Sequence, residues 1–189
     1  MSVRRGLTRQ DAVDVATAIV DEEGPAALTL SRVARELDVK PPSLYNHVSG
    51  LDALVRDVAL QAIDEFGRRM GVAVMGRSGR KALRAAATEF RAYAVEHPGR
   101  YELTARARPD DDEYAAASWR SVEPVVAILR GYDLDAEDAI HATRTLRAAL
   151  HGFVSLEALG GFGLDVDIDA SFDWLVEHLA DTLEPHPVT

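Results

Sequence analysis

VKPPSLYNHVSGLDAL, residues 39–54, is the stretch of this chain that decides the fold. Its two adjacent prolines, Pro41 and Pro42, predict the start of a helix, because proline fits a first turn where the missing N–H needs no partner. Leu44 and Val48 are spaced as the buried side of that helix. The other side chains of the stretch are polar or aromatic. We therefore expect a short helix over 41–48 that turns its polar side outward.

Helical periodicity continues on both sides of this stretch. Thr8 is predicted to cap a first helix, with Asp11 as its capping-box partner, and Gly24 ends it. Thr29 is predicted to cap a second, short helix, and Ser49 a fourth. No alternating strand pattern is present, so the predicted fold class is all-α, with an N-terminal three-helix helix-turn-helix domain and a C-terminal helical domain.

Further along the chain, a glycine-rich stretch at 71–79 predicts the junction between two domains. Helical patterns then run to His97, from Tyr114 to Leu129, from Ala136 to Leu159 and from about Ala170 to Leu183. Pro124 lies inside one of these patterns and predicts a kink. The expected organisation is a helix-turn-helix domain over 1–50, a linking helix over 51–70 and a helical C-terminal domain over 80–189.

The composition restricts the function. The chain has 189 residues, no cysteine and a formal net charge of −10. Most of the acidity is C-terminal, since residues 1–70 carry 9 basic and 11 acidic residues and residues 71–189 carry 12 and 20. DNA binding requires a basic face rather than a basic chain. The absence of cysteine and of a long apolar run favours a cytoplasmic protein with no membrane partner.

Two short helices joined by a tight turn form a helix-turn-helix, whose second helix reads the major groove. The outward side chains here are short polar or aromatic groups that can reach base edges and phosphates. The stretch TLSRVARELDVKPPSLYNHV, followed by D-x-L at Asp52 and Leu54, resembles the helix-turn-helix of the TetR (tetracycline-repressor) family of transcription regulators. The resemblance implies DNA contacts by Thr29, Arg32, Lys40, Pro41, Pro42, Ser43, Tyr45, Asn46 and His47.

Two departures from the family pattern concern the turn and the residue after the recognition helix. The turn usually has glycine where this chain has Asp38, and Asp tolerates a positive φ better than most residues. The family usually has a phosphate-binding lysine where this chain has Gly50 and Leu51. We therefore expect a shallower salt dependence of DNA binding than in a lysine-bearing relative, with Arg4, Arg5 and Arg9 able to compensate.

The sequence of the C-terminal part indicates its function less specifically than that of the N-terminal part. ALHGFVSLEALGGFG, residues 149–163, resembles a His-Gly signature of one subgroup of TetR-like C-terminal domains. Family resemblance implies that residues 80–189 form an effector-binding and dimerisation domain, which binds a small molecule and makes a homodimer. The last two helices are apolar enough to pair with their copies across a two-fold axis. The candidate ligand-binding residues are Phe90, Tyr93, Tyr101, Trp119, His151 and Phe153, although each also fits an ordinary core. The candidate dimer-interface residues are Ala149, Gly152, Leu156, Phe172, Leu175, Val176 and Leu179.

Catalytic and metal chemistry find no support in the sequence. The alternating aspartates at 165, 167 and 169 resemble a calcium loop, but Ala170 and Val176 stand where that loop needs Gly and Glu. No catalytic motif, metal site or cofactor is predicted, and the chain is not expected to be an enzyme. The leading hypothesis is a homodimeric DNA-binding regulator, a repressor that binds a palindromic operator and is released by an effector. The alternative is a helical ligand-binding or interaction protein with little DNA binding.

Overall fold

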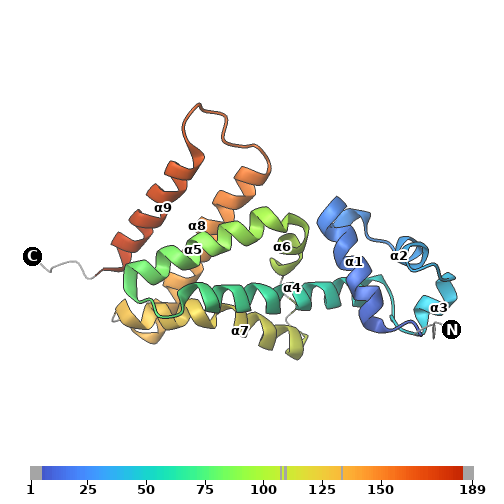
Figure 1. Cartoon of the computed structure of the whole chain (residues 1–189). Helices are drawn as coiled ribbons and strands as arrows, with labels where there is room; N and C mark the ends of the chain where they lie inside the picture. The colour runs from blue at the N-terminus through green and yellow to red at the C-terminus, as the bar shows by residue number, and fades with distance from the viewer. Residues whose placement is uncertain (1–5, 107, 109, 133, 185–189) are drawn as a thin grey trace, which may run out of the picture. The chain divides into compact units, whose positions relative to one another are not determined.

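A computed structural model describes residues 6–184 apart from 107, 109 and 133. Every regular element within this part of the chain is a helix, which confirms the all-α prediction (Figure 1). None of the described helices is long and apolar enough to cross a membrane. The α-helices are α1 (Arg9–Glu23), α2 (Leu30–Glu36), α3 (Pro41–Tyr45), α4 (Leu51–Val74), α5 (Gly79–Glu96), α6 (Pro98–Thr104), α7 (Asp112–Leu129), α8 (Ala136–Ala158) and α9 (Ile168–Leu183), with short 3-10 turns at Pro25–Ala27 and Arg130–Tyr132.

The described residues divide into two compact units. The N-terminal unit takes in the chain up to Ile63 together with His97–Ala115, and the C-terminal unit takes in Asp64–Glu96 and the chain from Ala116 onward. Helix α4 therefore contributes its first half to one unit and its second half to the other. Residues 97–115 group with the helix-turn-helix, whereas the sequence had suggested that they belong with the effector domain.

In the N-terminal unit, the caps predicted for the first two helices form as expected. The Thr8 hydroxyl accepts a hydrogen bond from the Asp11 N–H, and the Asp11 carboxylate accepts one from the Thr8 N–H in return. The Thr29 hydroxyl accepts a hydrogen bond from the N–H of Arg32 and so caps α2. Apolar residues of α1, α2 and α3 then form one core, which includes Val20, Val33 and Leu44.

Helix α6 packs closely on α1 within the same unit. Gly99 has no side chain at the contact, and a Cβ built there would lie 2.2 Å from the backbone oxygen of Val20. Next to it, Arg100 is only 8% exposed and donates from Nε to a carboxylate oxygen of Asp21 at 2.8 Å. The small residue permits the close approach, and the part-buried ion pair connects α6 to α1.

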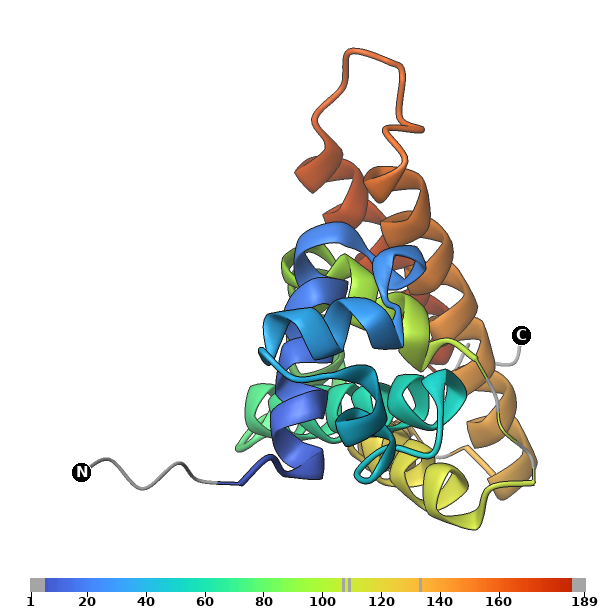
Figure 2. The same ribbon diagram turned by 90° about the vertical axis from the view of Figure 1, so that its right-hand side faces the viewer.

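In the C-terminal unit, α5 packs against both α8 and α9. Both views show α8 and α9 side by side, joined by the loop over 159–167 (Figures 1 and 2). Arg80 of α5 pairs with Glu177 and Asp181 of α9, and Arg91 pairs with Glu157 of α8. Charged rows along α5 therefore supplement the apolar contacts that hold the two C-terminal helices.

Several helix limits differ from the sequence expectation. Helix α3 ends at Tyr45 rather than at Val48, and residues 46–47 form a turn that still buries Val48. Helix α4 begins at Leu51, so Gly50, at φ 143°, precedes it rather than the expected cap Ser49. The same helix continues past Gly71 to Val74, so the break expected at 71–79 comes later, because single glycines inside a helix weaken it without ending it.

The turn between α2 and α3 contains Asp38 at φ 53°, which is the left-handed conformation. This confirms the expectation that Asp38 tolerates the positive φ of a turn position where glycine is usual. We predict that Asp38→Val lowers the free energy of unfolding by roughly 1–2 kcal/mol, because a β-branched residue is strained at positive φ. Asp38→Gly should stay within about 0.5 kcal/mol of the parent, since glycine relieves the strain but loses more entropy on folding. Urea denaturation of both variants checks this, and equal stability of the two would contradict it.

Candidate nucleic-acid interface and apolar cavity

Helix α3 turns one side into the core and the other to solvent. Leu44 is 1% exposed and Val48 is 3% exposed, whereas Tyr45 is 59% exposed. The remaining candidates on and beside this helix are also exposed: Lys40, Pro41, Pro42, Ser43, Asn46 and His47. The structure therefore brings the predicted outward side chains together on one surface, and this surface has the residue types that contact base edges and phosphates.

This surface is held by backbone and core contacts beneath it. Helix α3 packs against α2, and the N–H of Ser43 donates to the carbonyl of Lys40 at 2.9 Å. The turn at the other end closes with the N–H groups of His47 and Val48, which both donate to the carbonyl of Leu44. A five-residue helix has little stability of its own. Its position therefore depends on the burial of Leu44 and Val48.

The two DNA-contact candidates on the preceding helix have roles within the protein. The oxygen of Thr29 accepts the α2 capping bond, which leaves its O–H available as a donor. Arg32 forms a bidentate ion pair with Glu23, and this pairing lowers the pKa of Glu23. A contact from Arg32 to DNA would therefore compete with an existing carboxylate.

Of the arginines expected to compensate for the missing phosphate-binding lysine, the structure describes only one. Arg4 and Arg5 lie outside the described residues, and Arg9 donates from both Nε and Nη2 to Asp57 at 2.7 and 2.6 Å. Leu51, where relatives of the expected family carry lysine, is 39% exposed at the first position of α4. Lys40 and Arg35 remain as exposed cations near α3, although Arg35 lies 3.4 Å from Glu36.

Ion pairs join the start of α4 to the segment between α6 and α7. Arg108 donates to both carboxylate oxygens of Asp52 at 2.9 and 3.1 Å, and this lowers the pKa of Asp52. Arg56 donates to Asp111 and Glu113, and hydrogen bonds from Arg56 lower the pKa of Asp111 to about 2. All of these groups belong to the N-terminal unit. They attach its α6–α7 segment to the helix that follows α3.

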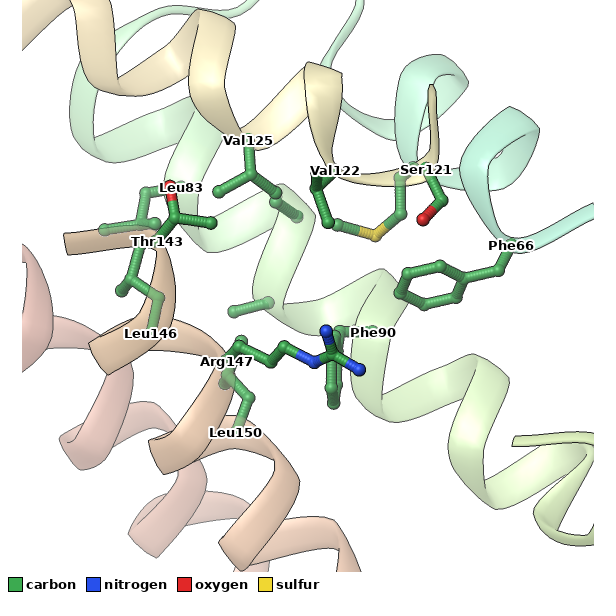
Figure 3. A pocket seen from close by; sticks show the side chains of 13 residues that line it. Phe66, Leu83, Phe90, Ser121, Val122, Val125, Thr143, Leu146, Arg147 and Leu150 are labelled. Atoms are coloured by element: carbon green, nitrogen blue, oxygen red, sulfur yellow. The ribbon is translucent and has the colours of Figure 1, made fainter. Parts of the chain in front are cut away.

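The C-terminal unit contains an apolar cavity of about 550 Å³, counting the space at its mouth (Figure 3). Its walls are mostly apolar with a few polar groups, which is the composition typical of small-molecule sites. Helices α4, α5, α7 and α8 supply its walls, with Phe66 and Phe90 in edge-to-face contact at 5.6 Å between ring centroids. The lining residues are Phe66, Met70, Leu83, Ala86, Ala87, Phe90, Ser121, Val122, Val125, Thr143, Leu146, Arg147 and Leu150.

Of the residues predicted to bind a ligand, Phe90 lines this cavity, while the others lie elsewhere. Tyr93 is fully buried and packs on Phe66, and Tyr101 lies on α6 in the N-terminal unit. Phe153 packs on Phe162 and Phe172, and Trp119 and His151 are exposed.

The sequence reasoning missed Phe66 and Met70, although a signal was present. They continue the four-residue spacing of Leu54, Val58 and Ala62 along α4. Arg147 has no such signal, because a single arginine on a helix is indistinguishable from a solvated charge.

The candidate dimer residues fall into two groups. Phe172 and Val176 are buried inside the single chain, so they belong to its own core. Leu156 is exposed, and Ala149, Gly152, Leu175 and Leu179 are half-buried. Further large apolar side chains are exposed on or beside α8 and α9, and the sequence reasoning had not singled them out: Ile140, Leu159, Leu164, Val166 and Trp174.

The aspartates that resemble a calcium loop have a structural role. Asp167 caps α9 by accepting a hydrogen bond from the N–H of Asp169, and Asp165 is exposed. Among the described residues, no three His, Asp or Glu side chains gather in a way that could hold a metal ion.

Comparison with known proteins identifies the family. A family model for the tetracyclin repressor-like C-terminal domain matches residues 83–179, about half of the chain. The uncharacterized HTH-type transcriptional regulator Rv0681 of Mycobacterium tuberculosis is 40% identical over 180 residues, which cover 94% of this chain and 82% of the relative. The regulator YobS of Bacillus subtilis, also described as uncharacterized, is 36% identical over 178 residues, covering 93% and 92%.

Among solved structures, BioQ with its double-stranded DNA operator matches with a TM-score of 0.68 and 26% identity, over 95% of this chain and 99% of that one. The fold, the outward side of α3 and these relatives agree with one another. This chain therefore belongs to the TetR family of helix-turn-helix, DNA-binding transcriptional regulators.

Proposed function

We propose that this regulator is a homodimeric repressor whose two α3 helices enter successive major grooves of a palindromic operator. The observation that carries the proposal is the exposed side of α3, where Tyr45 and its polar neighbours lie over a buried Leu44. The related protein BioQ has been solved with its DNA operator, which supports the same use of the fold. A two-fold dimer requires half-sites related by the same symmetry.

The dimer is supported by the apolar side chains on α8 and α9. Leu156 and Trp174 are exposed in the single chain, and exposed apolar groups that gather on neighbouring elements mark interaction surfaces. A Cβ at Gly152 would meet nothing within 4 Å, so no close contact with the described residues explains a glycine within α8. We propose that a second copy covers this surface and forms a four-helix bundle with it.

The cavity in the C-terminal unit is the proposed effector site. Phe66 and Met70 line it from α4, and the other end of α4 follows the recognition helix. A ligand that favours one arrangement of α4 would change the spacing of the two α3 helices in the dimer and release the operator. This is a coupling between two sites through a rigid element. The protein is proposed to act in the cytoplasm, with no catalytic role.

An electrophoretic mobility shift with the DNA upstream of the protein's own gene tests the proposal. We expect a retarded complex that survives an excess of unrelated duplex, because specific binding exceeds non-specific binding by about a thousandfold or more. The net charge of −10 and the internal pairing of Arg9 and Arg32 favour the alternative of a helical binding protein without an operator. Equal competition by specific and unrelated duplexes would support that alternative.

The missing lysine at the start of α4 gives a separate prediction. Leu51→Lys should steepen the slope of log K against log salt by about 0.9 per protomer, because one more phosphate contact releases counterions. Fluorescence anisotropy at several salt concentrations measures the slope. Ser78→Lys, in the exposed turn after α4, adds the same charge away from the helix-turn-helix and is the matched control. A slope that is unchanged by Leu51→Lys would contradict the assignment of this position.

A further inference from the structure

The polar groups that line the cavity are, with one exception, already used inside their own helices. The hydroxyl of Ser121 donates to the carbonyl of Ser118 at 2.8 Å, and that of Thr143 donates to the carbonyl of Ala139 at 2.8 Å. The rest of the wall is formed by aliphatic and aromatic side chains apart from Arg147. An apolar ligand body fits these walls, and a polar ligand body would lose its hydrogen bonds to water without replacement.

Arg147 is the exception. Its guanidinium extends from α8 toward Phe90 and Phe66 (Figure 3). No described residue forms an ion pair with it, and no Asp or Glu lines the cavity. Other arginines of the same unit are matched with carboxylates, as Arg91 is with Glu157 and Arg80 is with Glu177. A cation at an otherwise apolar site therefore stands without an anion from the described part of the chain.

We propose that the effector is a small apolar monocarboxylate, whose tail occupies the cavity and whose carboxylate binds the guanidinium of Arg147. The inference rests on the proposed use of the cavity as the effector site. The planar guanidinium presents two parallel N–H donors to the two oxygens of a carboxylate. Arg147 is exposed to solvent in the single chain, so the apolar walls would exclude water from only the inner side of this pair and strengthen it there.

The same features disfavour other ligand classes. A neutral molecule of equal size fills the cavity but gives the guanidinium of Arg147 no counter-charge. An apolar cation is repelled by it. A dicarboxylate would place its second charge against Phe66, Phe90 or the aliphatic wall, where no cationic lining residue can pair with it. The specificity is therefore expected to depend on one negative charge at one end of the molecule.

Isothermal titration calorimetry of the full-length protein tests the proposal with matched probes. The acids are octanoate and phenylbutyrate, each compared with its neutral amide, and octylammonium represents the opposite charge. We expect each acid to bind about 10-fold or more tightly than its amide, because a charge-assisted hydrogen bond is worth more than a neutral one. Octylammonium should bind most weakly. Two acids that bind no better than their amides, or not at all at millimolar concentration, would overturn the proposal.

The variant that removes the charge is Arg147→Gln, and Arg144→Gln is its control. Arg144, like Arg147, is exposed to solvent. It lies almost one turn earlier on α8 and does not line the cavity. Arg147→Gln should reduce acid binding to the level of the amide and leave amide binding unchanged. Arg144→Gln should bind every probe as the parent does. Equal losses of acid binding in the two variants would contradict the assigned contact.

The mobility shift separates this inference from the proposed function. Acid binding that depends on Arg147, in a protein that binds no operator, would support the ligand class and overturn the regulatory role. Operator binding without any difference between acids and amides would support the regulatory role and overturn the ligand class. If both hold, addition of the better acid should weaken the operator complex of the parent and of Arg144→Gln, and it should not weaken that of Arg147→Gln.

Discussion

Gly99→Ala is expected to destabilise the N-terminal unit by about 3 kcal/mol, at the upper end of the cost of overpacking. The new Cβ would lie 2.2 Å from the carbonyl oxygen of Val20 and 3.0 Å from its Cγ1. A backbone atom cannot rotate away as a side chain can, so α6 must withdraw from α1. That movement also strains the part-buried pairing of Arg100 with Asp21.

The measurement is thermal unfolding followed by circular dichroism, with an expected fall in Tm of roughly 6–12 °C for a chain of this length. Gly131→Ala is the control, since a Cβ there would meet nothing within 4 Å. The operator affinity of Gly99→Ala should fall as well, because α6 supports the unit that carries the recognition helix. A variant as stable as the control would show that the contact between α6 and α1 is looser than described.

Tyr45→Ala is expected to lower operator affinity on the order of 100-fold. Each protomer loses a contact worth about 1–2 kcal/mol, and the dimer loses two. The free energy of unfolding should change by less than about 0.5 kcal/mol, because Tyr45 is 59% exposed. Fluorescence anisotropy with labelled operator measures the affinity, and urea denaturation measures the stability.

Two further substitutions make the result specific. Tyr45→Phe keeps the ring and removes the hydroxyl, so it separates stacking or packing on DNA from a hydrogen bond to phosphate. Trp119→Ala removes an aromatic of nearly equal exposure, 58%, from α7 in the other unit. It should leave operator affinity unchanged. Equal losses in Tyr45→Ala and Trp119→Ala would mean that the assay reports general surface changes rather than a contact by α3.

The sequence predicted the N-terminal unit well, because its signals are local. Caps at Thr8 and Thr29 and the positive φ of Asp38 depend on neighbouring residues, and each appears in the structure as expected. The spacing of Leu44 and Val48 fixed which side chains of α3 face outward. The length of α3 was wrong, because the burial of Val48 in a turn gives the same spacing as burial in a helix.

The C-terminal unit was harder to predict because its site is assembled from distant segments. The cavity joins residues from four helices, and only one of the aromatic candidates, Phe90, lies in its wall. The packing of Phe153 on Phe172 and the exposure of Trp119 depend on how whole helices are rotated. Periodicity identifies an apolar side of a helix, but it does not reveal whether that side meets its own core, a ligand or a second copy.

Selection of bound duplexes from a random DNA library tests the central claim most directly. The full-length protein should enrich an inverted repeat whose half-sites lie on successive major grooves, and Tyr45→Ala should enrich it far less under the same conditions. An enriched sequence without two-fold symmetry, or equal enrichment by the parent and Tyr45→Ala, would contradict a dimeric regulator that reads DNA through α3.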